Sequence, residues 1–289
     1  MMRGPYQSAM AIRRPDGSIT TETWITFAGG RKWYQKVPIL RGCFSFIDSL
    51  RVGYRCLMRS ADLAGFDEEP TAFEKKLTER FGKKATDAIT YLAMLLGVIL
   101  AVGLFMLLPS VLVDLAGESI PRWSRTLLEG VLKIGIFVAY LAAVSRTSDM
   151  HRMFQYHGAE HKTIACYEAG MELTPENVRQ FTRFHPRCGT SFLLIVLVVS
   201  VLVFSLVTWE NLVVRVLLKI ALLPVTVGIS FEIIRYAGRY SNPLTHLISA
   251  PGLWLQRLTT AEPDTEHIEV AIASMKPCIP EDGSDQWGA

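Results

Sequence analysis

The stretch AITYLAMLLGVILAVGLFMLLPSVLV, residues 88–113, decides the fold class, because no charged side chain interrupts it. A helix that crosses a bilayer needs about 20 consecutive apolar residues. Three further stretches have a similar character, at residues 127–144, 191–207 and 212–234. The sequence therefore predicts a mainly α-helical, polytopic membrane protein with four transmembrane helices.

The composition shows that the spans are not the whole chain. Half of the 289 residues are hydrophobic, but 20% are charged, which is more than a chain lying entirely within a membrane carries. The formal net charge of +3 gives no indication of a nucleic-acid partner. We therefore expect polar segments outside the spans and the lipid bilayer, not nucleic acid, as a partner.

Basic side chains gather before the first span and between the second and the third. Such residues mark cytoplasmic segments, so both termini and the middle segment are expected on the cytoplasmic side. The five cysteines agree with that side, because their odd number and the lack of a C-x-x-C pair favour reduced thiols. The first thirty residues hold no apolar core behind a basic start, so no cleavable signal peptide is expected.

Charged residues also lie inside two spans. Glu129 and Lys133 are one turn apart in the second span, and Arg215 and Lys219 are one turn apart in the fourth. Charges inside a membrane are costly and usually face a partner or water. Two interpretations are open: Lys133 and Arg215 extend to the membrane surface, or the charges line a water-accessible cavity or a subunit interface.

The residues before the first span predict a small αβ unit. Pro15-Asp16-Gly17 is a turn signal between alternating runs, so residues 8–27 read as a β-hairpin. Residues 41–63 read as an amphipathic helix. This helix either lies on the membrane surface or packs on the hairpin or another subunit. Its apolar stripe comprises Phe46, Leu50, Tyr54 and Leu57.

The C-terminal tail predicts one more helix, between Pro263 and Pro277. Its apolar stripe indicates a docking helix, and His267 is expected on the solvated face. The predicted units are residues 1–84 (N-terminal cytoplasmic αβ unit), 85–144 (first transmembrane hairpin), 145–190 (cytoplasmic helical hairpin), 191–238 (second transmembrane hairpin) and 239–289 (C-terminal tail).

The segment QYHGAEHKTIACYEAG, residues 155–170, carries the polar residues of greatest chemical interest. It belongs to a predicted helix at 145–169 that stops at Gly170. Residues i and i+4 share a helix face, so two histidines and two carboxylates continue an apolar stripe. The stripe comprises Met150, Met153, Phe154, His157, Glu160, His161, Ile164 and Glu168.

A second helix is expected to start at Thr174 and Pro175 and to end near Phe184. His185 and Cys188 then fall in a turn directly before the third span. A thiol just before a helix N-terminus is favoured as a thiolate by the helix dipole.

His157 and His161 can chelate one divalent metal, of which zinc is one option, because their rings lie one turn apart. Glu160 is then the expected general base, as in the inverted H-x-x-E-H arrangement. Glu168 as third ligand gives an open catalytic site. His185 and Cys188 as further ligands give a closed, structural site.

A metal-free interpretation is also open. Glu160 and Glu168 would then pair with Arg183 or Arg187, and the histidines would form hydrogen bonds between helices.

Five motifs give the chain a resemblance to a known family. They are MMRGP at 1–5, RRPDGSI at 13–19, YHGAEHKTIACYE at 156–168, RFHPRCGTSF at 183–192 and LTTAEP at 258–263. Together they resemble the YqhQ-like bacterial membrane proteins, a domain-of-unknown-function family labelled as predicted metal-dependent enzymes. The resemblance implies a bacterial cytoplasmic membrane and implies metal or catalytic roles for His157, Glu160 and His161.

Two functions are consistent with these features. The first is a membrane-embedded metal-dependent hydrolase that acts on a peptide or lipid-linked substrate. The alternative is a non-enzymatic homo-oligomeric scaffold or channel-like assembly that assists other membrane proteins in insertion or quality control. An open coordination position favours the enzyme, and histidines buried between helices of a ring favour the scaffold.

Overall fold

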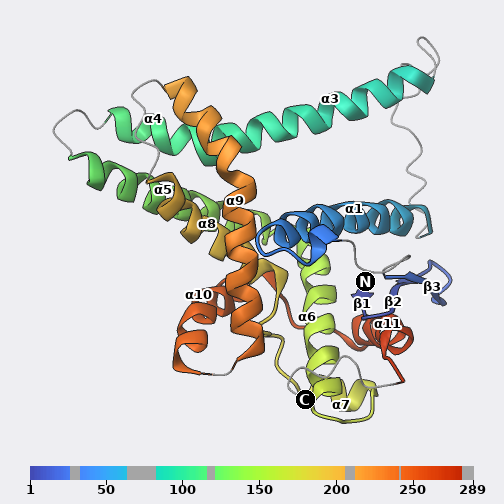
Figure 1. The fold of residues 1–289 in the computed structure, drawn as a ribbon. Helices are drawn as coiled ribbons and strands as arrows, with labels where there is room; N and C mark the ends of the chain where they lie inside the picture. Colours follow the sequence, from blue (N-terminus) through green and yellow to red (C-terminus); the bar gives the residue numbers. More distant parts are fainter. Residues whose placement is uncertain (27–32, 64–82, 116–120, 206–211, 241, 282–289) are drawn as a thin grey trace.

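The computed structural model describes residues 1–26, 33–63, 83–115, 121–205, 212–240 and 242–281. The chain is mainly helical, with a small sheet near its N-terminus. The sheet lies at one side of the molecule, beside the helices at residues 148–168 and 265–275, and the long helix at residues 83–102 runs across the top of the view (Figure 1).

The first predicted span is present but is not one regular helix. It consists of α3 (Lys83–Val102), the π-helical turn η2 (Gly103–Leu107) and α4 (Leu108–Leu115). Pro109 has no backbone N–H to donate to a preceding turn, and the wider π turn lies directly before it. Leu92–Leu115 is long and apolar enough to cross a membrane.

The second and fourth predicted spans correspond to α5 (Arg122–Val144) and α9 (Leu212–Arg239). Both contain a segment that is long and apolar enough to cross a membrane, which gives three such helices among the described residues. The third predicted span, 191–207, corresponds to α8 (Gly189–Phe204), an apolar helix of only 16 residues. The last two residues of that predicted span lie outside the described residues, and four spans are not confirmed.

The predicted hairpin is confirmed. Strand β2 (Gln7–Arg13) pairs antiparallel with β3 (Ile19–Ile25), and Gly17 turns the chain with a φ of 82°. A two-residue strand, β1 (Met2–Arg3), which was not predicted, adds to the other edge of β2.

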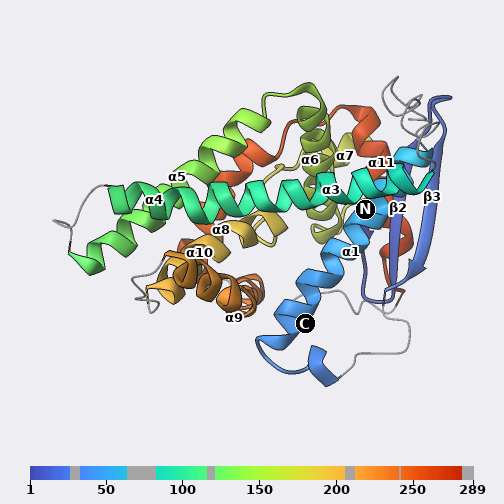
Figure 2. The ribbon, with the colours of Figure 1, turned by 90° about the horizontal axis from the view of Figure 1, so that it is seen from above.

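The predicted C-terminal helix is confirmed as α11 (Thr265–Met275). Figure 2 shows it beside the sheet and α6 (Ser148–Glu168), and it packs against both. The two ends of the described chain therefore share one hydrophobic core around α6. Its buried residues are Met2, Ala9, Ala159, Cys166, Val178, Ile268, Ala271, Ile272 and Cys278.

The expectation for His267 was wrong. Its side chain is buried, and its ring lies edge-on to Tyr156 at 4.5 Å between centroids. The reason is tertiary: α11 contacts both α6 and β2, so the flank of its apolar stripe is covered as well.

The predicted amphipathic helix is confirmed as α1 (Leu40–Leu63), which follows a 3-10 turn at Trp33–Gln35. It lies against α9, where a Cβ atom on Gly42 would come within 2.6 Å of Phe231. The Leu50, Tyr54 and Leu57 side chains of its apolar stripe are exposed.

Two further α-helices lie in the chain before α8 and after α9. Helix α7 (Pro175–Arg179) starts as predicted, with Thr174 as its N-cap, but ends at Arg179 instead of near Phe184. Helix α10 (Pro243–Thr259) starts in a capping box built on Asn242.

Candidate metal centre

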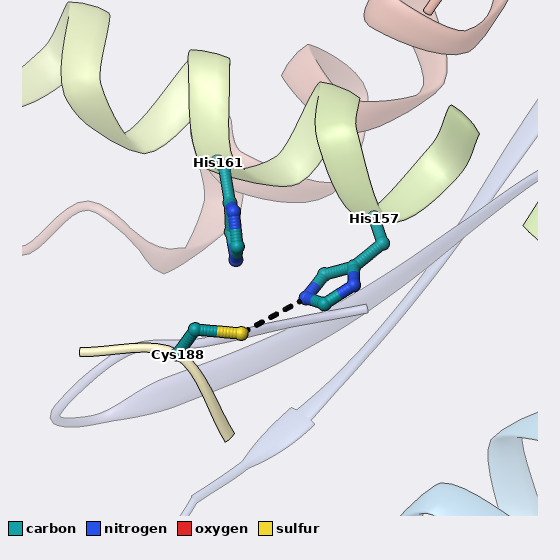
Figure 3. Close-up of side chains that lie close together, drawn as sticks. All are labelled: His157, His161 and Cys188. Carbon is teal, nitrogen blue, oxygen red and sulfur yellow. Dashed lines mark hydrogen bonds between the residues drawn. The ribbon is translucent and has the colours of Figure 1, made fainter. Parts of the chain in front are cut away.

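The two histidines and one cysteine converge from separate parts of the chain. His157 and His161 lie one turn apart on α6, the predicted helix, which stops before Gly170 with its φ of 68°. Cys188 is the N-cap residue of α8, as its position before an apolar helix predicted. Figure 3 shows both rings projecting from α6 toward Cys188.

Backbone carbonyls fix the orientation of both rings. The Nδ1 atom of His157 lies 2.7 Å from the carbonyl oxygen of Thr259, and that of His161 lies 2.6 Å from the carbonyl oxygen of Arg183. A carbonyl can only accept, so each Nδ1 donates. Metal-binding histidines usually have this type of outer contact, which leaves Nε2 of each ring available.

The ligand atoms are close enough for one ion to bridge them with small side-chain movements. His157 Nε2 lies 3.1 Å from Cys188 Sγ. One ring nitrogen from each histidine and the sulfur all lie within 4.8 Å of one another. Two histidines and a cysteine are ligands that zinc accepts, so this group can hold a metal.

Electrostatics favour an ionised thiol. Burial raises the pKa of Cys188, but the hydrogen bonds and charges of His157 and His161 outweigh it and lower the pKa to about 5. In the same way, burial lowers the pKa of His157, yet its contacts with Cys188 and Thr259 raise it above its usual value. A thiolate is the form of cysteine that binds metal.

The pH dependence of alkylation should identify this thiol. In metal-free protein, iodoacetamide should modify Cys188 at a rate that rises with a midpoint of about pH 5, because the thiolate is the reactive form. Burial raises the pKa of the other four thiols, so their rates should rise only at a pH above the pKa of an ordinary thiol. The ionised Cys188 stabilises the fold above the pKa of an unfolded thiol, and this stabilisation is lost as the pH falls toward 5.

Peptide mapping after brief labelling at each pH measures these rates. His157→Ala should move the Cys188 midpoint upward. If Cys188 of the wild-type protein had the same midpoint as the other four cysteines, the histidines would not hold its thiol ionised.

A cavity of about 360 Å³ adjoins the three residues. Glu160 lines it, half-buried, and its Oε1 atom forms an ion pair with the N-terminal ammonium group of Met1 at 2.6 Å. The polar half of the stripe predicted on α6 therefore lines the cavity, together with the turn before α8. Its lining residues are Met1, Met2, Arg3, His157, Glu160, His161, Ile164, Glu168, His185, Arg187, Cys188 and Gly189.

Two residues predicted as further ligands make other contacts. Glu168 forms an ion pair with Arg187, and its Oε2 atom lies 3.5 Å from His185 Nε2. The pairing of Glu168 with Arg187 agrees with the metal-free interpretation of that carboxylate. The pairing with His185 holds both predicted ligands at the cavity wall, outside the group of three.

Sequence reasoning missed the residues that support the site. Gln256 is fully buried; its Oε1 accepts from the His185 N–H at 2.8 Å and its Nε2 donates to the His185 carbonyl at 2.7 Å. Thr259 is the last residue of α10, and the carbonyls at a helix end lack partners within the helix. The LTTAEP motif, which includes Thr259, contributed to the family resemblance, but it did not predict that the Thr259 carbonyl contacts His157.

Comparison with known proteins identifies the family of this chain. The family model described as "Protein of unknown function (DUF1385)" matches residues 37–281. The "Uncharacterized protein YqhQ" of Bacillus subtilis (strain 168) is 36% identical over 286 residues, which cover 95% of this chain and 87% of that protein. No solved structure matches the chain significantly. The chain therefore belongs to the YqhQ-like family of unknown function that the DUF1385 model describes.

Proposed function

We propose that this chain is a membrane-bound, metal-dependent hydrolase. The observation that carries the proposal is the convergence of His157, His161 and Cys188 beside a cavity that Glu160 also lines. Three protein ligands are typical of catalytic zinc sites, which keep one position open, whereas structural sites have four.

Each residue has a distinct role in this proposal. The two imidazoles and the thiolate hold a divalent metal, with zinc as the first candidate, and a bound metal supplies Lewis acidity. Glu160 accepts a proton from the attacking water. The Thr259 and Arg183 carbonyls keep the imidazoles in the tautomer whose Nε2 faces Cys188.

The proposed substrate class follows from the position of the cavity close to the apolar helices. In the described part of the chain, three helices are long and apolar enough to span a bilayer, and α6 follows α5 after a short turn. A cavity so close to the ends of spans suits a peptide or a lipid-linked substrate. We propose that the cavity lies at the cytoplasmic face of a bacterial cytoplasmic membrane and that both termini lie on that face. We also propose that the protein is a homo-oligomer.

Turnover of membrane material tests the proposal. The full chain, reconstituted with zinc, is incubated with membrane peptides and lipids from cells that lack it, and the products are identified by mass spectrometry. Wild-type protein should release products. Glu160→Gln should retain the metal and release none, whereas Glu172→Gln, at an exposed position, should behave as wild type.

Absence of any product difference between wild type and Glu160→Gln would reject hydrolysis by this site. The metal would then be structural, and the oligomeric scaffold that assists other membrane proteins would become the better account.

One observation favours a second chemistry at the same residues. The 3.1 Å contact between His157 Nε2 and Cys188 Sγ also suits a thiolate nucleophile beside a histidine. A chelator separates the two functions, because it should abolish a metal-dependent reaction and leave a thiolate-dependent one intact. A covalent substrate adduct on Cys188 would also support the second chemistry.

The exposed stripe of α1 is proposed to face lipid. Leu50, Tyr54 and Leu57 are exposed, and Arg51 and Arg55 flank them, which suits an interface with anionic lipid. A photo-crosslinking amino acid at Leu50 or Leu57, in the full chain in anionic nanodiscs, should give lipid adducts by mass spectrometry. The same group at Thr21, exposed on β3, should give none. Crosslinks to a second copy would instead assign the stripe to a subunit interface.

A further inference from the structure

A second polar cluster lies on the apolar helices, outside the candidate metal centre. Glu129 lies in the first half of α5 and Lys133 at its middle, Ser110 lies on α4, and Lys219 lies two turns into α9. The other ends of α5 and α9 lead to α6 and α10 (Figure 1). The cluster therefore lies between the middle of α5 and the start of α9, away from the ends that lead to the metal centre, and its role is independent of the proposed hydrolase.

Two of the charges neutralise each other. Lys219 forms an ion pair with Glu129, and the side chains are only 3% and 13% exposed. The Ser110 hydroxyl donates to Glu129 Oε1 at 2.6 Å and accepts from Lys219 Nζ at 3.3 Å. This pair is satisfied without a further partner.

Lys133 is the unbalanced charge. It is 5% exposed, so it does not extend to the membrane surface, which was one interpretation of its sequence position. Among the described residues its ammonium group has no ion pair or hydrogen bond, and its close partner is the ring of Phe204, 4.8 Å from Nζ to the centroid. The other basic residue in this interpretation, Arg215, pairs with Asp114 at 2.6 Å.

The ammonium of Lys133 adjoins a small cavity. The cavity measures about 10 Å³ and is lined by Thr126, Glu129, Gly130, Lys133, Val201, Phe204 and Lys219. That is room for about one water-sized particle. Two ammonium groups and one carboxylate around it leave a net charge of +1, and an unpaired charge in such surroundings is costly.

We infer that this cavity is a binding site for one small monovalent anion of the size of chloride. The anion would lie between Lys133 and Lys219, where it removes the net charge. The hydroxyl of Thr126, on the same wall, is available as a donor. The size of the cavity excludes a phosphate or a lipid headgroup, and the aromatic ring of Phe204 stabilises the free ammonium when no anion is bound.

Halide binding tests the inference on the full chain in nanodiscs of zwitterionic lipid. The line width of bromide in solution NMR, which rises on exchange with a bound site, is followed during titration with chloride at constant ionic strength. Wild-type protein should broaden the bromide line, and chloride should reverse the broadening. Lys133→Met should reduce it to the level of empty nanodiscs, whereas Lys36→Met, at an exposed position outside the spans, should not.

A stability measurement keeps the inference testable if Lys133→Met does not fold. The melting temperature of wild-type protein should be higher in chloride than in gluconate at the same ionic strength. Bromide broadening that is absent in wild type or unchanged in a folded Lys133→Met would overturn the site. Equal melting temperatures in the two salts would do the same.

Discussion

Cys188→Ser is expected to remove nearly all bound metal from the purified protein. The substitution replaces a thiolate, which the surrounding histidines hold ionised, by a hydroxyl that stays neutral. Removing even an outer-shell partner of a metal ligand costs about 10–100-fold in affinity, so the loss of a ligand should cost more. Metal content after dialysis against a competing chelator measures the effect.

His157→Ala and His161→Ala should give the same result, because each removes one of the three converging ligand atoms. The matched control is Cys166→Ser. Cys166 lies on the same helix as the histidines but belongs to the hydrophobic core, so its replacement should leave the metal content unchanged. Cys188→Ser protein with the metal affinity of wild type would show that the thiol is not a ligand.

Gly158→Ala should destabilise the protein strongly and lower its metal content at the same time. A Cβ atom at position 158 would lie 2.2 Å from the carbonyl oxygen of Ala261. Helix α6 and the segment after α10 would therefore have to separate. That movement strains the backbone hydrogen bond from Ala261 N to Phe154 O and the nearby contact of Thr259 with His157. Overpacking of this type costs about 1–3 kcal/mol or more, which thermal unfolding in detergent detects.

Gly53→Ala is the control for Gly158→Ala. Gly53 lies within α1, and nothing is within 4 Å of the position of its Cβ atom. Alanine is favoured over glycine in a helix by about 1 kcal/mol, so this variant should unfold at the same temperature or higher. A Gly158→Ala variant as stable as Gly53→Ala would contradict the close packing of α6 on the segment after α10.

Local signals explain what the sequence predicted. The helix period placed His157 and His161 on one face, and the order of Cys188 before an apolar run placed its thiol at a helix start. Pro15-Asp16-Gly17 located the hairpin turn, and Gly170 located the end of α6. Each of these features depends on residues within a few positions of one another, where spacing determines geometry.

Long-range packing explains what the sequence did not predict. The two carbonyls that orient the histidines belong to Thr259 and Arg183, and a backbone acceptor has no signature in the side-chain pattern. Gln256 reaches His185 across 71 positions of the chain. The burial of His267 and Lys133 likewise depends on which helices pack beside them.

The ligand set of the bound metal tests the central claim most directly. X-ray absorption at the zinc edge, on wild-type protein purified without chelator and reloaded with zinc, reports the number and type of ligands. The account predicts about one zinc per chain with one sulfur ligand at about 2.3 Å and nitrogen or oxygen ligands at about 2.0–2.1 Å. Zinc well below one per chain, or a spectrum without a sulfur ligand, would contradict it.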